Sequence, residues 1–365
     1  MERKIRVGVV FGGKSTEHEV SLLSAQSIIR ALDAERFDVV LIGIDKDGRW
    51  ALCDEAIPLL HADDPKRIAL SPAACPVAVV PGDRDGRLSA LGKELPVPQL
   101  DVVFPVLHGP LGEDGTVQGL LKLANIPFVG AGVLGSAVGM DKDVAKRLLR
   151  DAGIPIADFL TVNARQAAAL SFDQVVARLG LPFFVKPANA GSSVGVSKVT
   201  DDDSYAMAMH EAFKFDGKVL IEEFIIGREI ACAVLGNDEP IASCLGEIVP
   251  THDFYSYEAK YLDEDGALLQ IPAEVEDGLV QQIRLLAVRT YQTLCCEGMA
   301  RVDFFLRPNG EALVNEINTI PGFTSISMYP KLWEASGMPY RTLLERLIDL
   351  ALERSERERS LQTSI

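Results

Sequence analysis

Residues 299–318 read MARVDFFLRPNGEALVNEIN and predict two neighbouring β-strands joined by a turn. Because side chains alternate between the two faces of a strand, Arg301 and Asp303 share one face of the first strand. By the same alternation, Glu316 and Asn318 share one face of the second. Their carboxylate and amide oxygens suit Mg²⁺, which commonly binds one or two protein carboxylates together with phosphate oxygens. The alternative is the exposed polar face of an edge hairpin.

A second stretch, VKPANAGSSVGV at residues 185–196, places Lys186 at the end of an apolar run and follows it with a loop of small residues. A lysine there can reach phosphate oxygens, and the N–H groups of a small-residue turn can converge on one anion. The loop matches neither the GxxxxGK(S/T) nor the GxGxxG phosphate-binding pattern. By its own residues, a plain turn between two strands is the simpler interpretation.

The first third of the chain alternates strand-like apolar runs with helical patterns, a rhythm typical of a parallel sheet with helices on its faces. The segments that carry it are residues 5–13, 21–33, 37–45, 101–109 and 115–130. Between residues 45 and 100 the pattern is irregular and contains several prolines. This predicts an insertion of short strands and loops.

Farther along, Asp141 is placed to cap a helix that ends at Gly153, and the strands and helices after it predict a compact α+β lobe. We therefore expect a chain of mixed α/β and α+β class with three domains, at residues 1–139, 140–223 and 224–365. The last helical pattern closes with ERSERER at residues 353–359. We expect this charged tail to be a solvated, fraying end.

Composition narrows the class of ligand. The 365 residues are 48% hydrophobic and 24% charged, and the formal net charge is −16. Such an acidic chain lacks the excess of Lys and Arg that nucleic acids or anionic membranes require, although local lysines can still bind a small anion. No apolar run of about 18 residues and no secretory signal is present, so we expect a cytoplasmic protein. The six cysteines contain no CxxC pair, which argues against a zinc site or a disulfide framework.

Seven motifs occur in one order along almost the whole chain: FGGKSTEHEVSL, LHGPLGEDGTVQG, MDKDVAKRLL, VKPANAGSSVGVSKV, FYSYEAKY, ARVDFF and NEINTIPGFTSISMYP. Together they resemble the ATP-grasp superfamily and, within it, the D-alanine:D-alanine ligase family. The chain length and the insertion at residues 45–100 resemble the longer of the two ligase forms found in enteric bacteria. The resemblance implies an ATP-grasp fold with an N-terminal parallel-sheet (pre-ATP-grasp) domain.

The resemblance also implies an activity: ATP-dependent joining of two D-alanines through an acyl phosphate, with release of ADP and phosphate, for peptidoglycan precursors and the cell wall. It implies ATP as co-substrate, two Mg²⁺ or Mn²⁺ ions and a homodimer through the N-terminal domain. No nucleic acid or membrane partner is expected.

Residue roles carry over by motif. Asp303, Glu316 and Asn318 are expected to bind the metal ions. Lys142 and Lys186 are expected to contact ATP phosphates. The other residues expected to bind ATP are Ser193 in the loop, Glu222 or Glu223 at the adenine amino group, and Glu229 at the ribose.

On the amino-acid side, the resemblance implies that Glu17 pairs with the ammonium of the first D-alanine, near His108. Ser192 and Tyr261 are expected to join Glu17 in a hydrogen-bond network. Arg301 and the Gly322 amide are expected to stabilise the tetrahedral oxyanion. The residues expected at the carboxylate of the second D-alanine are Lys260, Ser327 and Met328. A tyrosine-rich loop with Tyr255, Tyr257 and Tyr261 is expected to exclude water.

Two other functions remain open from the sequence. One is another ATP-grasp carboxylate–amine ligase, including a D-alanine:D-lactate ligase; the Lys260–Tyr261 pair favours an amine as the nucleophile. The other is a nucleotide-binding regulator that has lost the chemistry. The intact set of Arg301, Asp303 and Glu316 argues against that reading.

Overall fold

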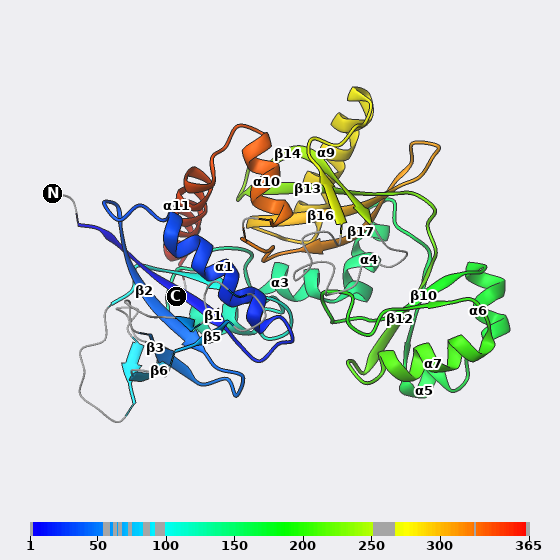
Figure 1. The fold of residues 1–365 in the computed structure, drawn as a ribbon, viewed down its shortest axis with the longest axis horizontal. Coiled ribbons are helices and arrows are strands. Elements are labelled where there is room, and N and C mark those ends of the chain that lie inside the picture. Colours follow the sequence, from blue (N-terminus) through cyan, green and yellow to red (C-terminus); the bar gives the residue numbers. More distant parts are fainter. Residues whose placement is uncertain are drawn as a thin grey trace.

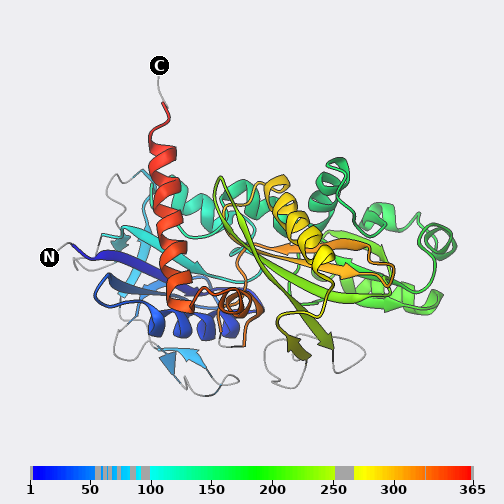
Figure 2. The same ribbon diagram turned by 90° about the horizontal axis from the view of Figure 1, so that it is seen from above.

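The computed structural model describes residues 3–53, 59–60, 64, 68–71, 75–82, 88–91, 99–250, 267–324 and 326–362. Three main sheets follow one another along the molecule, and helices pack on their faces (Figure 1). The view from above shows the same succession, with the C-terminal helix standing over the N-terminal sheet (Figure 2). None of the described helices combines the length and apolar character of a membrane span.

The centre of the N-terminal sheet is parallel, as expected. Strand β1 (Ile5–Gly12) pairs in parallel with β2 (Phe37–Ile44) on one side and with β8 (Val102–Val106) on the other. These strands are almost continuously apolar because both faces are covered. Helices α1 (His18–Ala31) and α11 (Tyr340–Arg359) pack on one face, and α2 (Thr116–Leu123) packs on the other.

The predicted insertion adds antiparallel strands to this sheet. Its order is β7-β6-β3-β2-β1-β8, so the insertion extends the sheet beyond β2. The inserted strands are β3 (Trp50–Leu52), β6 (Cys75–Val79) and β7 (Leu88–Ala90), together with a separate pair, β4 (Leu59–Leu60) and β5 (Ala69–Leu70). The sheet is therefore mixed, with its parallel part at the residues that alternate with helices.

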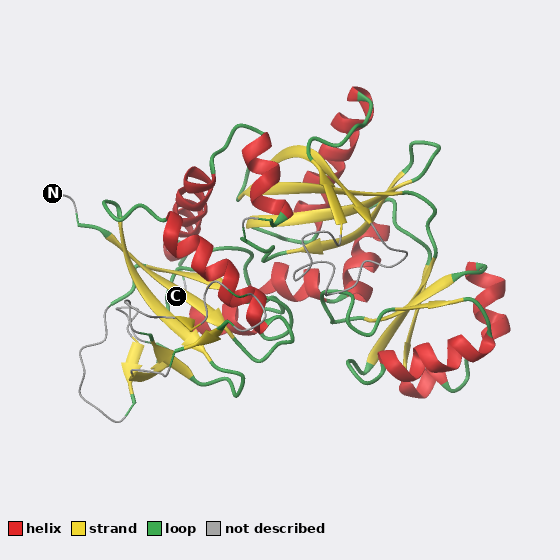
Figure 3. Cartoon of the chain, viewed as in Figure 1, coloured by secondary structure: helices red, strands yellow, loops and turns green. Residues whose placement is uncertain are grey.

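The second sheet is antiparallel and has the order β11-β10-β12-β9. Its strands are β9 (Phe159–Asn163), β10 (Phe183–Pro187), β11 (Ser197–Val199) and β12 (Lys218–Glu223). Its helices are α5 (Ala164–Ala167), α6 (Phe172–Leu179) and α7 (Asp202–Ala212). Colouring by secondary structure shows these helices together beside the sheet (Figure 3). The stretch 185–196 joins β10 to β11, so it is a turn between two antiparallel strands.

The third sheet is antiparallel, with the order β15-β14-β13-β16-β17. Its strands are β13 (Arg228–Gly236), β14 (Ile241–Pro250), β15 (Ala267–Gln270), β16 (Gly298–Leu306) and β17 (Ala312–Asn318). Helix α9 (Asp277–Thr293) packs on one face, and α10 (Met328–Ala335) packs on the other. Helices α3 (Val133–Met140) and α4 (Lys142–Asp151) connect the first sheet to the second.

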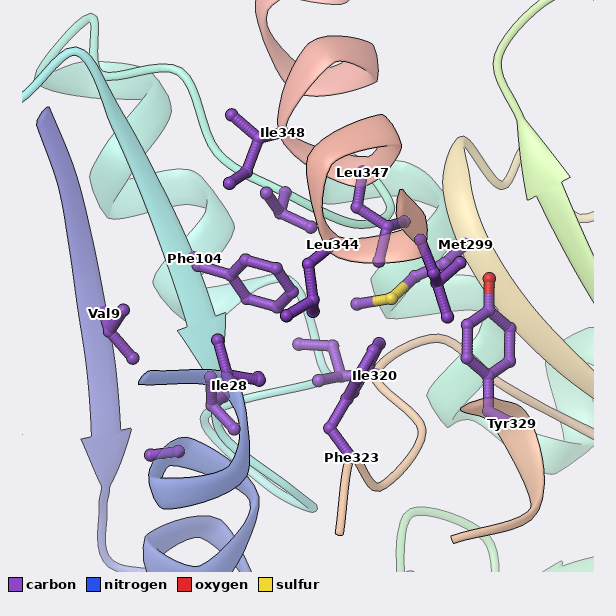
Figure 4. Close-up of a cluster of buried hydrophobic side chains, with 14 of the residues drawn as sticks. Val9, Ile28, Phe104, Met299, Ile320, Phe323, Tyr329, Leu344, Leu347 and Ile348 are labelled. Carbon is purple, nitrogen blue, oxygen red and sulfur yellow. The ribbon is translucent and has the colours of Figure 1, made fainter. Parts of the chain in front are cut away.

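One apolar core joins the first and third sheets. In Figure 4, Phe104 of β8 and Ile28 of α1 lie on one side, Tyr329 of α10 on the other, and Phe323 and Leu344 between them. The rings of Phe104 and Phe323 meet edge to face with centroids 5.8 Å apart. This continuous packing fixes the N-terminal sheet relative to the strands that carry the predicted metal ligands.

The expectation of a frayed C-terminal tail is wrong. Helix α11 continues to Arg359, and the Arg354 side chain is only 4% exposed. Its guanidinium donates to the carbonyl oxygens of Phe128 at 2.6 Å and Gly130 at 2.5 Å, and it lies over the Phe128 ring. Arg357 pairs with Glu297 of the third sheet region. The charges therefore attach the helix end to the body of the protein, because they meet carbonyl and carboxylate partners that sequence spacing does not reveal.

Candidate active site

The polar face of β16 and β17 forms the wall of a cavity of about 670 Å³. Asp303 is paired with Glu316 across the two strands, and Arg301 with Asn318. The register shifts between Asp303 and Phe304, which marks a bulge beside these side chains. Bulges commonly re-aim side chains next to functional sites. The face is therefore not the exposed edge of a hairpin, and the four residues of the opening stretch lie together.

The donor set on this wall fits a divalent cation. The Asn318 Oδ1 atom is buried without a hydrogen-bond partner among the described residues. Asp303 accepts two hydrogen bonds of 2.7 Å from Arg301, and Glu316 Oε2 lies 3.4 Å from Lys142 Nζ. The two carboxylates and the unpartnered amide oxygen are hard oxygen donors of the kind that Mg²⁺ binds. The described residues do not, however, form a cluster of three His, Cys, Asp or Glu side chains that could hold a metal by themselves. Further ligands would have to come from water or from substrate oxygens.

Lys142 lies between this wall and the small-residue loop. Asp141 caps α4 by accepting from the Val144 N–H at 3.1 Å, as the sequence predicted. The cap places Lys142 at the first helical position, where its Nζ donates to the Ala190 carbonyl at 2.7 Å. The Lys142 amide also donates to the Ala188 carbonyl. One lysine thus contacts both the loop and Glu316.

The loop reaches across to the N-terminal domain. Ser192 and Ser193 have φ values of 51° and 60°, a left-handed conformation that is uncommon outside glycine. In this conformation Ser192 Oγ donates to Glu17, which is 4% exposed at the start of α1. A Cβ atom on Gly191 would lie 2.9 Å from Glu17 Oε2, so a side chain at this position would shift the Glu17 carboxylate. The structure brings Glu17 and Ser192 together as expected.

Glu222 lies in a buried cluster with two lysines. Its carboxylate is 3% exposed and has the ammonium groups of both Lys146 and Lys186 at 3.0 Å. Burial opposes ionisation of Glu222, but the two lysines hold its pKa below the usual value. Glu223 accepts from the Asp158 amide at 2.8 Å and pairs with Arg307. Both glutamates are engaged within the protein.

Lys146 was missed from sequence. It lies one helical turn after Lys142 in MDKDVAKRLL, a spacing that places both lysines on one face of α4 and that could have identified it. Burial lowers its pKa although Glu222 lies beside it. The result is a closed cluster of two lysines and one glutamate.

His108 is fully engaged inside the protein. Its Nδ1 lies 2.9 Å from the Ile320 carbonyl, which makes Nδ1 the donor, and its Nε2 lies 3.3 Å from Ser24 Oγ. Burial lowers the pKa of His108, against the carboxylate of Glu17, which raises it. The ring is thus neutral and holds the N-terminal domain to the segment before Gly322.

The start of α10 forms another part of the cavity lining. Gly322, Ser327 and Met328 line it, with Ser327 in the N-cap position. Ser327 Oγ accepts from the Thr324 amide at 3.0 Å. A helix N-terminus favours anions. This end of the cavity is suited to a carboxylate.

Of the residues predicted from sequence, most line this one cavity. They are Glu17, Lys142, Ser192, Glu229, Arg301, Asp303, Glu316, Asn318, Gly322, Ser327 and Met328. Lys186, Ser193, Glu222, Glu223 and His108 lie outside its lining. Lys260, Tyr261, Tyr255 and Tyr257 lie outside the described residues. Glu113 lines the cavity and was missed; only its position within LHGPLGEDGTVQG singles it out.

Comparison with known proteins covers nearly the whole chain. The family model "D-ala D-ala ligase N-terminus" matches residues 6–131, and "D-ala D-ala ligase C-terminus" matches residues 148–349. The chain is 58% identical to D-alanine--D-alanine ligase A of Escherichia coli K12, over 99% of this chain and 100% of the relative. It is 54% identical to D-alanine--D-alanine ligase of Oceanobacillus iheyensis, over 99% of both.

Solved structures agree. The D-alanine-D-alanine ligase of Coxiella burnetii superposes with a TM-score of 0.86 at 40% identity, covering 98% of this chain and 97% of the other. The VanG D-Ala:D-Ser ligase of Enterococcus faecalis superposes with a TM-score of 0.83 at 36% identity, covering 96% of this chain and all of the other. The chain therefore belongs to the D-alanine–D-alanine ligase family.

Proposed function

We propose that this protein joins two molecules of D-alanine into D-alanyl-D-alanine, using ATP and releasing ADP and phosphate, for peptidoglycan precursor synthesis. The observation that carries the proposal is a single cavity with three chemically distinct regions. Its lining includes a buried carboxylate, Glu17, the oxygen donors of the wall and the N-terminus of helix α10. Glu17 suits the ammonium of a D-alanine, the wall suits phosphates bound with metal ions, and the helix N-terminus suits a carboxylate.

In the first step, a carboxylate oxygen of one D-alanine attacks the γ-phosphorus of ATP, and ADP leaves. Asp303, Glu316 and Asn318 would hold two Mg²⁺ or Mn²⁺ ions, which when bound neutralise the charge on the phosphates. Lys142 contacts the same phosphate oxygens from the loop side. The tie between Lys142 and the loop carbonyl at residue 190 positions the loop over the nucleotide.

On the nucleotide side, we propose that Lys186 and Ser193 contact phosphates and that Glu229, which lines the cavity, binds the ribose. Glu222 keeps Lys186 in place through their ion pair. The sequence-based role of Glu222 or Glu223 at the adenine amino group stays a prediction. Lys146 supplies additional positive charge beneath this region.

In the second step, the amine of the other D-alanine attacks the acyl-phosphate carbonyl carbon, a C–N bond forms, and phosphate leaves. Arg301 and the Gly322 N–H would stabilise the oxyanion that forms on that carbonyl. Glu17, held by Ser192, would bind the ammonium of the first D-alanine. Lys260, Ser327 and Met328 would hold the carboxylate of the second, while the loop with Tyr261 would exclude water.

The second substrate is the point at which related ligases differ, since one structural neighbour is named a D-Ala:D-Ser ligase. We propose D-alanine, because the relatives that are more than 50% identical carry that name. The alternative is a different nucleophile, such as D-lactate. Incubation with ATP, Mg²⁺ and equimolar D-alanine, D-serine and D-lactate, followed by mass spectrometry of the products, separates these cases. D-alanyl-D-alanine as the dominant product is expected; a dominant ester or D-alanyl-D-serine would contradict the assignment.

We also propose a cytoplasmic location, where ATP is available, a homodimer through the N-terminal domain, and the domain boundaries at residues 139 and 223. Sedimentation analysis tests the dimer. A mass corresponding to one chain at micromolar concentration would contradict it.

A further inference from the structure

Glu113 lies at the centre of a tight turn that follows β8. The Gly109 and Leu111 residues of this turn have φ values of 75° and 68°. The Glu113 amide donates to the Gly109 carbonyl at 2.9 Å, and the Gly109 amide donates to Glu113 Oε1 at 2.9 Å. The carboxyl group is thus folded back under its own turn, buried, and turned toward the cavity wall.

The same turn brings Glu17 close to Glu113. A Cβ atom on Gly109 would lie 2.7 Å from Glu17 Oε2. Gly109 therefore donates its N–H to Glu113, while the Glu17 carboxyl group occupies the space beside the Gly109 Cα. Two acidic side chains meet at one glycine, in a part of the molecule from which water is largely excluded.

Glu113 also faces the third sheet region. The Ile320 backbone acts on the Glu113 carboxyl group and lowers its pKa, while the Ile320 carbonyl accepts from His108 Nδ1. The backbone on both sides of the Ile320 Cα thus meets side chains of the N-terminal domain. Two residues later comes Gly322, whose amide is a proposed oxyanion donor. The turn connects the proposed ammonium site to the proposed oxyanion site.

The charges around Glu113 favour its protonated form. Burial raises the pKa of Glu113 to about 8, with the Glu17 carboxylate adding to the effect. The Gly109 and Ile320 N–H groups and the more distant Arg301 act in the opposite direction but do not cancel it. His108 is neutral and adds no charge. At neutral pH, Glu113 therefore carries a proton.

We propose that Glu113 is a positioning residue of the first-substrate site, which holds the Ile320 peptide against the site and releases a proton to solvent when an ammonium binds at Glu17. The inference rests on the proposed function. An ammonium beside Glu17 offsets the carboxylate charge that adds to the effect of burial on Glu113. Because linkage is reciprocal, loss of that proton must in turn strengthen ammonium binding.

The test compares pH profiles of kcat/KM for D-alanine at saturating ATP, between pH 6.5 and 9. In the unaltered protein, kcat/KM should rise about fivefold across pH 8. Glu113→Gln keeps the side-chain volume and an acceptor for the Gly109 N–H but cannot titrate, so its profile should lack this contribution and change only with the titration of the amine nucleophile. Asp114→Asn, which removes the neighbouring half-buried carboxylate, is the matched control and should keep the rise.

Glu113→Ala is expected to raise the KM for D-alanine about tenfold while lowering kcat less, because the turn and Ile320 lose their contact. If this variant fails to fold, the comparison of Glu113→Gln with Asp114→Asn decides alone. A rise near pH 8 in Glu113→Gln as large as the rise in the unaltered protein would overturn the inference. Absence of D-alanine-dependent ADP release in the unaltered protein would instead overturn the proposed function.

Discussion

The buried cluster around Glu222 and the wall formed by β16 and β17 both contain carboxylates, but their surroundings differ. Around Glu222, the ammonium groups of Lys146 and Lys186 each lie 3.0 Å from one carboxylate, so opposite charges pair in a closed interior, although Lys146 Nζ and Glu222 Oε2 do not meet hydrogen-bond geometry. On the wall formed by β16 and β17, Asn318 Oδ1 is buried and has no hydrogen-bond partner among the residues that the structure describes, and the carboxylates border a large cavity. Buried polar groups without partners are costly unless a ligand or water satisfies them. The comparison sets an interior cluster of paired charges against a wall whose oxygen donors border a cavity.

The largest effect is expected on the wall. Glu316→Gln removes a proposed metal-binding charge, so ATP turnover with D-alanine should fall about 10³-fold, while the thermal midpoint stays close to that of the unaltered protein. Glu311→Gln makes the same change on the exposed turn before β17 and should leave turnover unchanged. If Glu316→Gln keeps more than about a tenth of normal turnover, the wall does not take part in catalysis.

The closed cluster should respond in stability. Glu222→Gln leaves two lysines in a buried site without their carboxylate, and we expect a loss of about 3–5 kcal/mol in the free energy of unfolding, measured with urea. Glu223→Gln removes the charge of a partly exposed pair with Arg307 but keeps an acceptor for the Asp158 amide, and its cost should be about 1 kcal/mol or less. If the two variants lose equal stability, the distinction between cluster and surface pair fails.

Sequence reasoning located the wall better than the cluster, for a physical reason. Strand alternation alone puts Arg301, Asp303 and Glu316 on defined faces, because it depends only on neighbours in the chain. The partners of Glu222 come from α4 and β10, which the fold brings together from distant segments. Sequence motifs singled out Glu222 for a contact with adenine, which stays a prediction, but could not say which side chains surround it.

The same limit explains the other differences. The parallel core of the first sheet follows from the alternation of strands and helices in the sequence. The inserted strands lie in the irregular stretch between residues 45 and 100, where no such alternation predicts which strands pair. Arg354 appears in sequence as one charge among many, yet it meets the carbonyl groups of Phe128 and Gly130. Glu113 is unremarkable in sequence because its burial comes from Glu17 and Ile320, each far away in the chain.

A smaller effect is expected where the loop meets the N-terminal domain. Ser192→Ala removes the hydrogen bond to Glu17, a charge-assisted contact, and should lower kcat/KM for D-alanine about tenfold. Ser197→Ala, at the start of β11 beyond the loop, is the control for loss of a hydroxyl. Steady-state kinetics at saturating ATP measure both. Equal kinetics in the two variants would mean that the loop does not act through Glu17.

The smallest effect concerns stability against acid. Burial lowers the pKa of His108 in the folded protein, so below about pH 6.5 the unfolded chain binds a proton that the folded chain does not. Stability should therefore fall as pH drops below about 6.5, and His108→Gln should reduce that slope. His210→Gln, at an exposed position in α7, should keep it. Urea unfolding at pH 7.5, 6.5 and 5.5 gives the slopes; identical slopes for all three proteins would contradict the burial argument.

The central claim is that the wall and the Glu17 end of one cavity together perform a ligation. The most direct measurement follows ADP and dipeptide simultaneously after D-alanine and Mg²⁺-ATP are mixed with the protein. We expect equal amounts of ADP and D-alanyl-D-alanine from the unaltered chain and neither product from Glu316→Gln. ADP formed without dipeptide, or dipeptide formed equally well by Glu316→Gln, would contradict the claim.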